Sequence, residues 1–317
     1  MTNEMVYMNN KPKSPWIGVG ESGNWNNVDE AMNICGLNFE VNSKHMSIDY
    51  EEDGMTYYET VPGYKATVRT DTHQPLGVVS NTYKVVQNND VFHLLDPFVE
   101  AGGVVTAGGM TKQGLCFMVA SLGTCNAGGD EYTVNVMATN SFNGRFPASL
   151  IWSPVRIVCQ NMYRSLLNES DNVARFRHSL NAHGRIESLK SAYEVFLDFD
   201  DMFTSKIETL KSRKATHSIE EFVELMFPYT VHDVDSSRYE SSRERIDEKR
   251  EYYINRYYNS STNSDHGTCF ALVNAYYDYI SHDVPVRKTE EEYRNSRLSK
   301  IVGGTMVKPA LMSFMCE

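Results

Sequence analysis

The alternation of hydrophobic and polar positions changes near residue 63. Before it, the segment NVDEAMNICG predicts a short helix that Asn27 caps and Gly36 ends. After it, GYKATVRT alternates with a period of two, and LGVVSNTYKVV is rich in β-branched and aromatic residues. The turn-forming DTHQP separates them, which predicts an antiparallel hairpin. Residues 1–62 are interpreted as an acidic N-terminal arm or small subdomain.

Beyond the hairpin, the pattern alternates between helix and strand. NNDVFHLLDPFVEAGG predicts a helix that begins at Asn89 or Asp90 and that Pro97 kinks or divides. Strands follow over GVVTAGGM, LCFMVASL, EYTVNVMATNSF and SLIWSPVRIVC, separated by TKQG and GTCNAGGD turns, and a helix is expected over 160–168. The β-β-α-β-β-β-α order of residues 63–181 predicts an α+β core, with helices on one face of a curved antiparallel sheet.

Residues 182–317 have helical spacing throughout. Ser218 and Glu221 form a capping box, and HGTCFALVNAYYDYI predicts an apolar helix rich in tyrosine. A further helix is expected over TEEEYRNSRLSKIVGG. Tyrosine gives a large contact area at low entropic cost, so these helices form either a core or an oligomer surface.

The charge of the chain is uneven. The whole chain carries −11, which argues against nucleic acid as a partner. Residues 1–60 contain three Lys/Arg and ten Asp/Glu, a net charge of −7, whereas residues 61–165 contain seven and six, a net charge of +1. A site for a polyanion therefore belongs in the middle of the chain.

Several classes of protein are disfavoured. No apolar run reaches the roughly 20 residues of a membrane span, and no signal peptide is evident, so we expect a cytoplasmic protein without membrane contact. The six cysteines lack the spacing of a zinc site, and no metal site is expected. GxSxG, GxxxxGK[ST] and GxGxxG are absent, so we expect no nucleotide cofactor and no catalytic residues of these kinds.

Basic and aromatic residues of the middle segment suggest a groove for single-stranded nucleic acid, in which cations follow phosphates and aromatic rings stack on bases. Solvated charges at a sheet edge are the alternative. The candidate cations are Lys65, Arg69, Lys84, Lys112, Arg145, Arg156, Arg164, Arg175, Arg177 and His178. The candidate stacking residues are Tyr64, Tyr83 and Phe142.

Two features of this set have competing interpretations. Asn143 and Gly144 predict a tight hairpin turn, or a loop whose backbone approaches phosphate closely. Arg156 lies in an apolar run, where a buried charge needs a partner, and a salt bridge to a carboxylate is the alternative to a functional role.

Metal-dependent chemistry has only weak candidates. His178, Asn181 and His183 resemble part of an HNH nuclease arrangement, without the surrounding ββα-metal pattern. The acidic segments VHDVD and DFDD could supply oxygen ligands to Mg²⁺, but solvated carboxylates are the default for such helical, acidic stretches.

The segments YKATVRTDTHQPLGVVSNTYKVVQN, VTAGGMTKQGLCFMVASL, NSFNGRFPASLIWSPVRIVCQN, ARFRHS and GTCFALVNAYYDYISH with RNSRLSKIVGG resemble a family of phage/plasmid-like proteins that carry a domain of unknown function. The likeness runs from about residue 63 to the end. More remotely, the order of elements is similar to the core of single-strand annealing proteins of the RecT/Redβ/Erf type. That resemblance implies a DNA groove between a β-hairpin and the sheet, no cofactor, and assembly as a ring or filament.

The leading hypothesis is therefore a non-catalytic protein of a phage or other mobile element that binds single-stranded DNA and promotes annealing in recombination. In it, the sheet contacts phosphates and the helical region self-associates as a homo-oligomer. The second hypothesis is an interaction protein that binds or inhibits a host defence or replication protein through acidic surfaces. The third is a metal-dependent nuclease.

Overall fold

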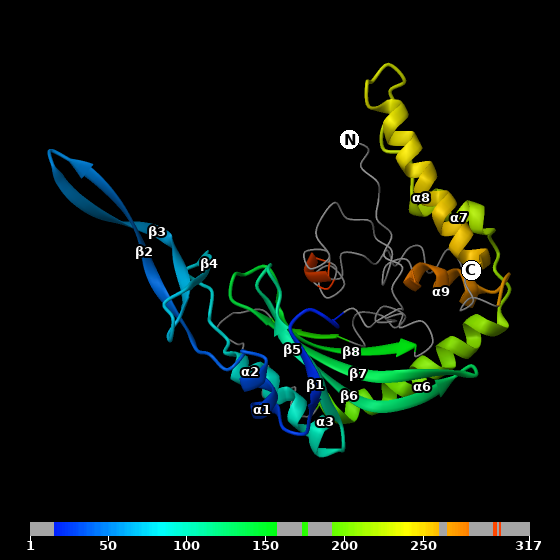
Figure 1. The fold of residues 1–317 in the computed structure, drawn as a ribbon, viewed down its shortest axis with the longest axis horizontal. Helices are drawn as coiled ribbons and strands as arrows, with labels where there is room; N and C mark the ends of the chain where they lie inside the picture. The colour runs from blue at the N-terminus through cyan, green and yellow to red at the C-terminus, as the bar shows by residue number, and fades with distance from the viewer. Residues whose placement is uncertain are drawn as a thin grey trace.

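The chain forms two antiparallel sheets and a set of helices (Figure 1). The computed structural model describes residues 16–156, 173–176, 192–259, 265–278, 294–296 and 298. The larger sheet has the order β1-β5-β6-β7-β8-β9. Its strands are β1 (Glu21–Trp25), β5 (Val104–Met110), β6 (Leu115–Ala127), β7 (Asp130–Ser141), β8 (Ala148–Arg156) and β9 (Val173–Phe176).

The central strand β6 is apolar on both of its faces. Successive side chains of a strand point to opposite faces of the sheet. Met118 and its alternate neighbours lie in the main hydrophobic core, whereas Phe117 lies in a second cluster that Trp16, Val19 and Leu298 complete. Coverage of both faces explains why the segment reads as a continuous apolar run.

Helices cover the first face of the larger sheet, as expected. The predicted helix with Pro97 is divided into three short pieces, and it begins after Gln87, earlier than Asn89. On the last helix of this face, Phe199 and Phe203 pack edge-on against Trp152, with ring centroids 5.9 and 5.5 Å apart. These helices are α1 (Val28–Ile34), α2 (Asn88–Phe92), η1 (His93–Leu95), α3 (Asp96–Glu100) and α6 (Ala192–Ser212).

Three further helices lie at one end of the molecule: α7 (Ile219–Met226), α8 (Tyr239–Asn259) and α9 (Cys269–Asp278). The capping box of α7 is confirmed, because Ser218 Oγ accepts from the N–H of Glu221 and the Glu221 carboxylate accepts from the N–H of Ser218. Tyrosines of α8 and α9 fill a core, with Tyr253, Tyr257, Tyr276 and Tyr277 all buried. None of the described helices is long and apolar enough to cross a membrane.

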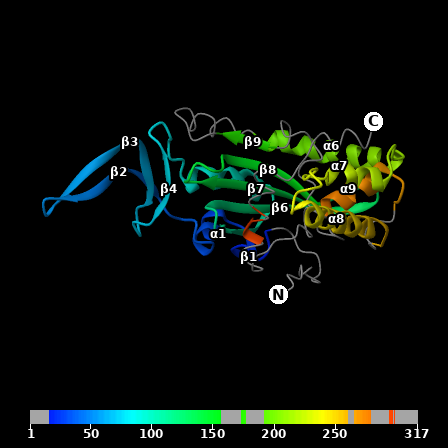
Figure 2. The same ribbon diagram turned by 90° about the horizontal axis from the view of Figure 1, so that it is seen from above.

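The smaller sheet contains β2 (Val41–Glu52), β3 (Met55–Arg69) and β4 (Pro75–Ser80) in that order. Asp53 and Gly54 join β2 to β3 with φ of 52° and 75°, and two positive φ values fit a type I′ hairpin turn. Strand β4 pairs with β3 only from Tyr64 to Val68. Residues 46–63 therefore form a two-stranded ribbon, here called the arm, that projects away from the larger sheet (Figures 1 and 2).

Several sequence predictions need correction. The predicted hairpin exists as β3 and β4, but it belongs to the smaller sheet rather than to one curved sheet. The proposed boundary at 62/63 falls inside β3, and β1 from the N-terminal segment adds an edge strand to the larger sheet. Strand β6 continues through most of GTCNAGGD to Ala127. The boundary at 181 and the helix at 160–168 lie outside the described residues.

The two sheets are held together at residues 141–143, here called the joint. Thr67 of β3 is buried, and its hydroxyl donates to the carbonyl oxygen of Phe142 at 2.6 Å. The hydroxyl of Tyr83 donates to the carbonyl oxygen of Ser141 at 2.9 Å. Gly77 of β4 lies so close that a Cβ there would be 2.6 Å from Cα of Asn143, so the joint excludes any larger residue.

We expect Thr67→Val to lower the free energy of unfolding by about 1–3 kcal/mol, because the valine keeps the shape but leaves the buried Phe142 carbonyl without this donor. Urea titration followed by circular dichroism measures the change. Thr60→Val, on the exposed arm, is the matched control and should change stability by less than about 0.5 kcal/mol. Equal changes in unfolding free energy for the two substitutions would contradict a stabilising role of the Thr67–Phe142 hydrogen bond.

Candidate nucleic-acid interface

Two connections of the larger sheet meet at the joint. Strands β5 and β6 are joined by residues 111–114, and β7 and β8 by residues 142–147, at the same end of the sheet. The amide nitrogen of Asn143 donates to the carbonyl oxygen of Gln113 at 2.7 Å. Asn143 thereby ties both connections to each other and, next to Gly77, to the smaller sheet.

The connection at Asn143 and Gly144 is not the predicted two-residue hairpin turn. Six residues separate β7 from β8, and Gly144 has a φ of 72° whereas Asn143 has no positive φ, as a type I′ turn would require. Instead, Oδ1 of Asn143 accepts from the backbone N–H of Arg145 at 3.1 Å. This Asx turn directs the chain so that Arg145 is exposed.

Half of the predicted cations gather at this end of the sheet. Lys65 lies opposite Val79 in register, and a methyl of Val79 is 3.7 Å from where a Cβ of Gly144 would lie. Lys84 and Lys112 are exposed beside Tyr83 and Gln113, which contact the joint. The backbone of Arg175 in β9 pairs with that of Ser149, at the start of β8, whereas the side chain of Arg175 lies outside the described residues. The group, here called the basic junction, is Lys65, Lys84, Lys112, Arg145 and Arg175.

Two of the basic-junction residues, Lys112 and Arg145, have no acidic neighbours along the chain. Residues 101–129 and 132–168, which supply Lys112 and Arg145, contain no Asp or Glu. Lys65 and Arg145 do not appear in any ion pair among the described residues. A surface of like charges drawn from separate segments attracts a polyanion.

Arg69 is part of the smaller sheet's own packing. Its Nε and Nη2 donate to the two carboxylate oxygens of Asp71 at 3.0 and 2.7 Å, and its guanidinium lies 4.1 Å from the ring centroid of Phe39. The hydrogen bond from Arg69 lowers the pKa of Asp71 to about 2. Because its charge already has a bidentate partner, Arg69 is removed from the candidate phosphate contacts.

Arg156 lies away from the basic junction. It pairs with Tyr132 at the far end of β8, eight residues along the strand from Ala148, which at about 3.3 Å per residue is roughly 26 Å. Arg145 and Arg156 therefore lie at opposite ends of β8, and Arg156 is not part of the basic junction. The side chain of Arg156, and Arg164, Arg177 and His178 altogether, lie outside the described residues.

The prediction that three aromatic residues can stack on bases is wrong for two of them. Tyr83 and Phe142 are 8% and 2% exposed, and both belong to the joint or the core beneath it. Burial raises the pKa of Tyr83. Tyr64 alone remains available, at 54% exposed and next to Lys65 in β3.

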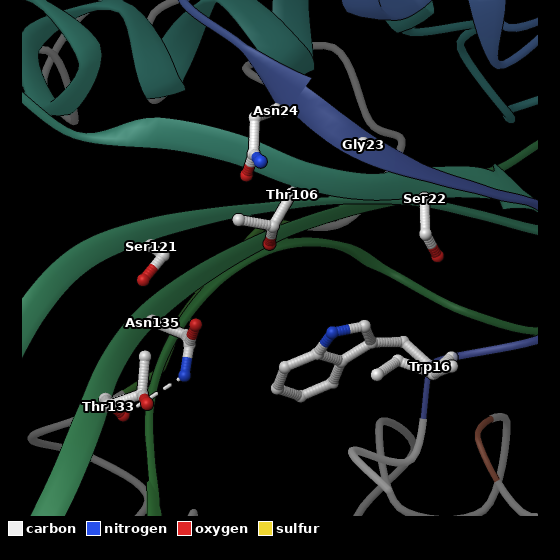
Figure 3. A pocket seen from close by; sticks show the side chains of 9 residues that line it. Trp16, Ser22, Gly23, Asn24, Thr106, Ser121, Thr133 and Asn135 are labelled. Atoms are coloured by element: carbon white, nitrogen blue, oxygen red, sulfur yellow. Dashed lines mark hydrogen bonds between the residues drawn. The ribbon is translucent and has the colours of Figure 1, made fainter.

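A polar hollow on the second face of the larger sheet has no counterpart in the sequence analysis (Figure 3). Its volume is about 340 Å³, and none of its described lining residues is charged. Asn135 is 3% exposed, and its amide nitrogen donates to the carbonyls of Thr133 and Ser153, so its oxygen is left facing the hollow. The lining is Trp16, Ile17, Ser22, Gly23, Asn24, Thr106, Ser121, Thr133 and Asn135.

The hollow can accept an uncharged polar group, because it offers hydroxyls, amides and an indole ring but no ion. Small residues, most of them polar, on four separate strands create it, and no spacing along one segment marks the whole set. Only knowledge of the strand order could have brought them together.

The metal-ligand candidates receive no support from the described residues. Oδ1 of Asp233 accepts from the N–H of Asp235 at 3.1 Å, which closes a turn before α8. Among the described side chains, no group of three His, Cys, Asp or Glu could hold a metal ion. His178, Asn181 and His183 lie outside them.

The family described as Domain of unknown function (DUF932) matches residues 75–302. The chain belongs to this family. No curated protein and no solved structure matches it. The DUF932 match begins at the first residue of β4, so it contains the joint and four of the five basic-junction residues, whereas Lys65 and the arm precede it.

We expect Tyr83→Phe in this DUF932 protein to lower the free energy of unfolding by about 0.5–1.5 kcal/mol, because the buried Ser141 carbonyl loses its donor. Tyr64→Phe is the matched control, and exposure of this hydroxyl predicts a change near zero. Chemical unfolding measures both. A larger loss of unfolding free energy in Tyr64→Phe than in Tyr83→Phe would contradict the burial of Tyr83 and the exposure of Tyr64.

Proposed function

We propose that the protein binds single-stranded DNA at the basic junction and promotes annealing without a nucleotide cofactor. The observation that carries this proposal is the convergence of cations from β3, the β5–β6 turn and the β7–β8 loop on one end of the larger sheet. Phosphate contacts of this kind supply most of the affinity of sequence-independent binding.

A single strand fits this surface better than a duplex. Tyr64 exposes its ring near the base of the arm, and an unpaired base can stack on such a ring. Because Tyr64 and Lys65 are successive residues of β3, their side chains point to opposite faces of the smaller sheet, so they would contact different nucleotides. Annealing follows from the same contacts, since a strand whose phosphates are neutralised repels its complement less. The phage or mobile-element setting, and assembly as a homo-oligomeric ring or filament through the helical region, belong to this proposal.

One observation favours the second candidate, an interaction protein that binds a host protein. The arm carries exposed tyrosines and five acidic residues, with no Lys, Arg or His between residues 46 and 64. A protruding acidic and aromatic surface is typical of protein recognition. In that case the protein does not bind DNA even at low salt.

Fluorescence anisotropy of labelled oligo-dT separates the two candidates. We expect salt-sensitive binding by the wild type, and a loss of tenfold or more at low salt in Lys65→Gln/Lys112→Gln/Arg145→Gln. The slope of log K against log salt should fall by about 2, at about 0.7 for each lost phosphate contact. The control Lys206→Gln/Arg238→Gln/Arg245→Gln removes three exposed cations of α6 and α8 or their flanks and should bind as the wild type does.

Absence of binding by the wild type at low salt would reject the DNA proposal and leave the second candidate. Equal losses in the two triple variants would show that net charge, rather than the basic junction, controls affinity. Annealing itself is measured with two complementary strands in the absence of ATP, and we expect the wild type to accelerate it and the basic-junction variant not to.

A further inference from the structure

The arm has two solvent-exposed faces and no described element packed on it. Its side chains from Ser47 to Thr60 are all exposed. The two strands pair residue by residue from Ser47 with Thr60 to Glu52 with Met55. Isolated two-stranded ribbons are marginally stable in water, so a ribbon of this length gains stability when a partner covers it.

One face of the arm is apolar in the middle. Tyr50 pairs with Tyr57, and Ile48 and Met55 lie on the same face by the period of two. All four are between 40% and 59% exposed, and the two tyrosine rings stack with centroids 5.5 Å apart. A contiguous apolar strip on a protruding element marks an interaction site.

Acidic side chains surround this apolar strip. Every charged residue between 46 and 64 is acidic, which gives the arm a charge of −5, from Asp49, Glu51, Glu52, Asp53 and Glu59. The carboxylates of Asp49 and Glu51 share one face of β2, whereas Glu52 and Glu59 flank the tyrosine pair. The partner that fits is therefore basic.

The basic junction is such a surface, but an arm cannot reach the one in its own chain. Lys65 lies at the base of the arm, opposite His45, and the arm leaves the joint and points away from the larger sheet (Figures 1 and 2).

We propose that the arm of one protomer docks on the basic junction of a second copy and there occupies the place of the DNA phosphates. The interface is head-to-tail, with different surfaces on the two copies, and such contacts build rings or open filaments. Its competition with DNA rests on the proposed function, whereas the docking itself does not. Assembly through the arm and DNA binding are then mutually exclusive at each basic junction.

The test uses two full-length variants. The arm variant Glu51→Gln/Glu52→Gln/Glu59→Gln keeps the basic junction, and the basic-junction variant Lys65→Gln/Lys112→Gln/Arg145→Gln keeps the arm. Sedimentation velocity at low salt should show association of the wild type and monomers for each variant alone. An equimolar mixture of the two variants should form a one-to-one heterodimer, because one intact arm meets one intact junction.

Monomers in the mixture, or undiminished association of the arm variant, would overturn the docking. The control Glu208→Gln/Glu224→Gln/Glu248→Gln removes three exposed carboxylates from α6, α7 and α8 and should associate as the wild type does. Its failure to associate would show that net charge alone drives assembly, which also overturns the proposal.

Binding of oligo-dT separates this inference from the proposed function. If both hold, the arm variant binds the oligonucleotide about threefold to tenfold more tightly than the wild type at low salt, because the competing arm is gone. A heterodimer without oligonucleotide binding by any variant leaves the docking intact and rejects the DNA function. Unchanged oligonucleotide affinity in the arm variant rejects the competition.

Discussion

The buried hydrogen bond from Thr67 to the carbonyl oxygen of Phe142 is the contact on which the arrangement of the two sheets depends. A carbonyl at the end of β7 would otherwise be buried without this donor, at a cost of about 1–3 kcal/mol. The Tyr83 hydroxyl satisfies the preceding carbonyl, and the missing side chain of Gly77 lets the backbones approach. Together these contacts fix the smaller sheet against one end of the larger sheet.

That fixed geometry places a cationic surface, the basic junction, and an anionic ribbon, the arm, in one protomer. Lys65 of the smaller sheet is held beside the loop that carries Arg145, so the basic junction exists only when the joint is formed. The same strand β3 continues past Lys65 into the acidic arm. One strand therefore supplies both the base of a cationic surface and half of an anionic ribbon, and the joint determines how the two are oriented.

Local patterns in the sequence predicted many elements but not their association. The meander from β5 to β8, the Asn27 cap and the capping box at Ser218 follow from periodicity and short-range hydrogen bonding. Residues 1–62 were interpreted as an acidic arm or small subdomain, but the two strands of the ribbon were not predicted, because both of its faces are exposed and no core imposes an alternation of apolar and polar residues.

The candidate site shows the same division between local and long-range information. The exposure of Arg145 was predictable from a turn rich in Asn and Gly. The burial of Phe142, three residues earlier, depends on packing against Phe39, which is about a hundred residues away in sequence. Arg69 also looked available, although its bidentate partner Asp71 is only two residues away in sequence. The long-range contact that holds the Arg69 guanidinium is with the ring of Phe39, and no local pattern indicates that contact.

Screening explains how an acidic arm and a basic junction can coexist in one protomer. Glu59 pairs with Ile48, which is three residues or about 10 Å along β2 from His45, the residue opposite Lys65, because the register shifts between these pairs. Glu51, Glu52 and Asp53 at the tip lie six to eight residues from His45, or about 20–26 Å. At 0.1 M salt the Debye length is about 10 Å, so the three acids at the tip hardly reduce the potential at the base of the arm. The arm affects a basic junction strongly only when a second copy brings the carboxylates into contact with the cations. A chain with a charge of −11 can therefore keep a surface that attracts polyanions, and can regulate that surface through its own concentration.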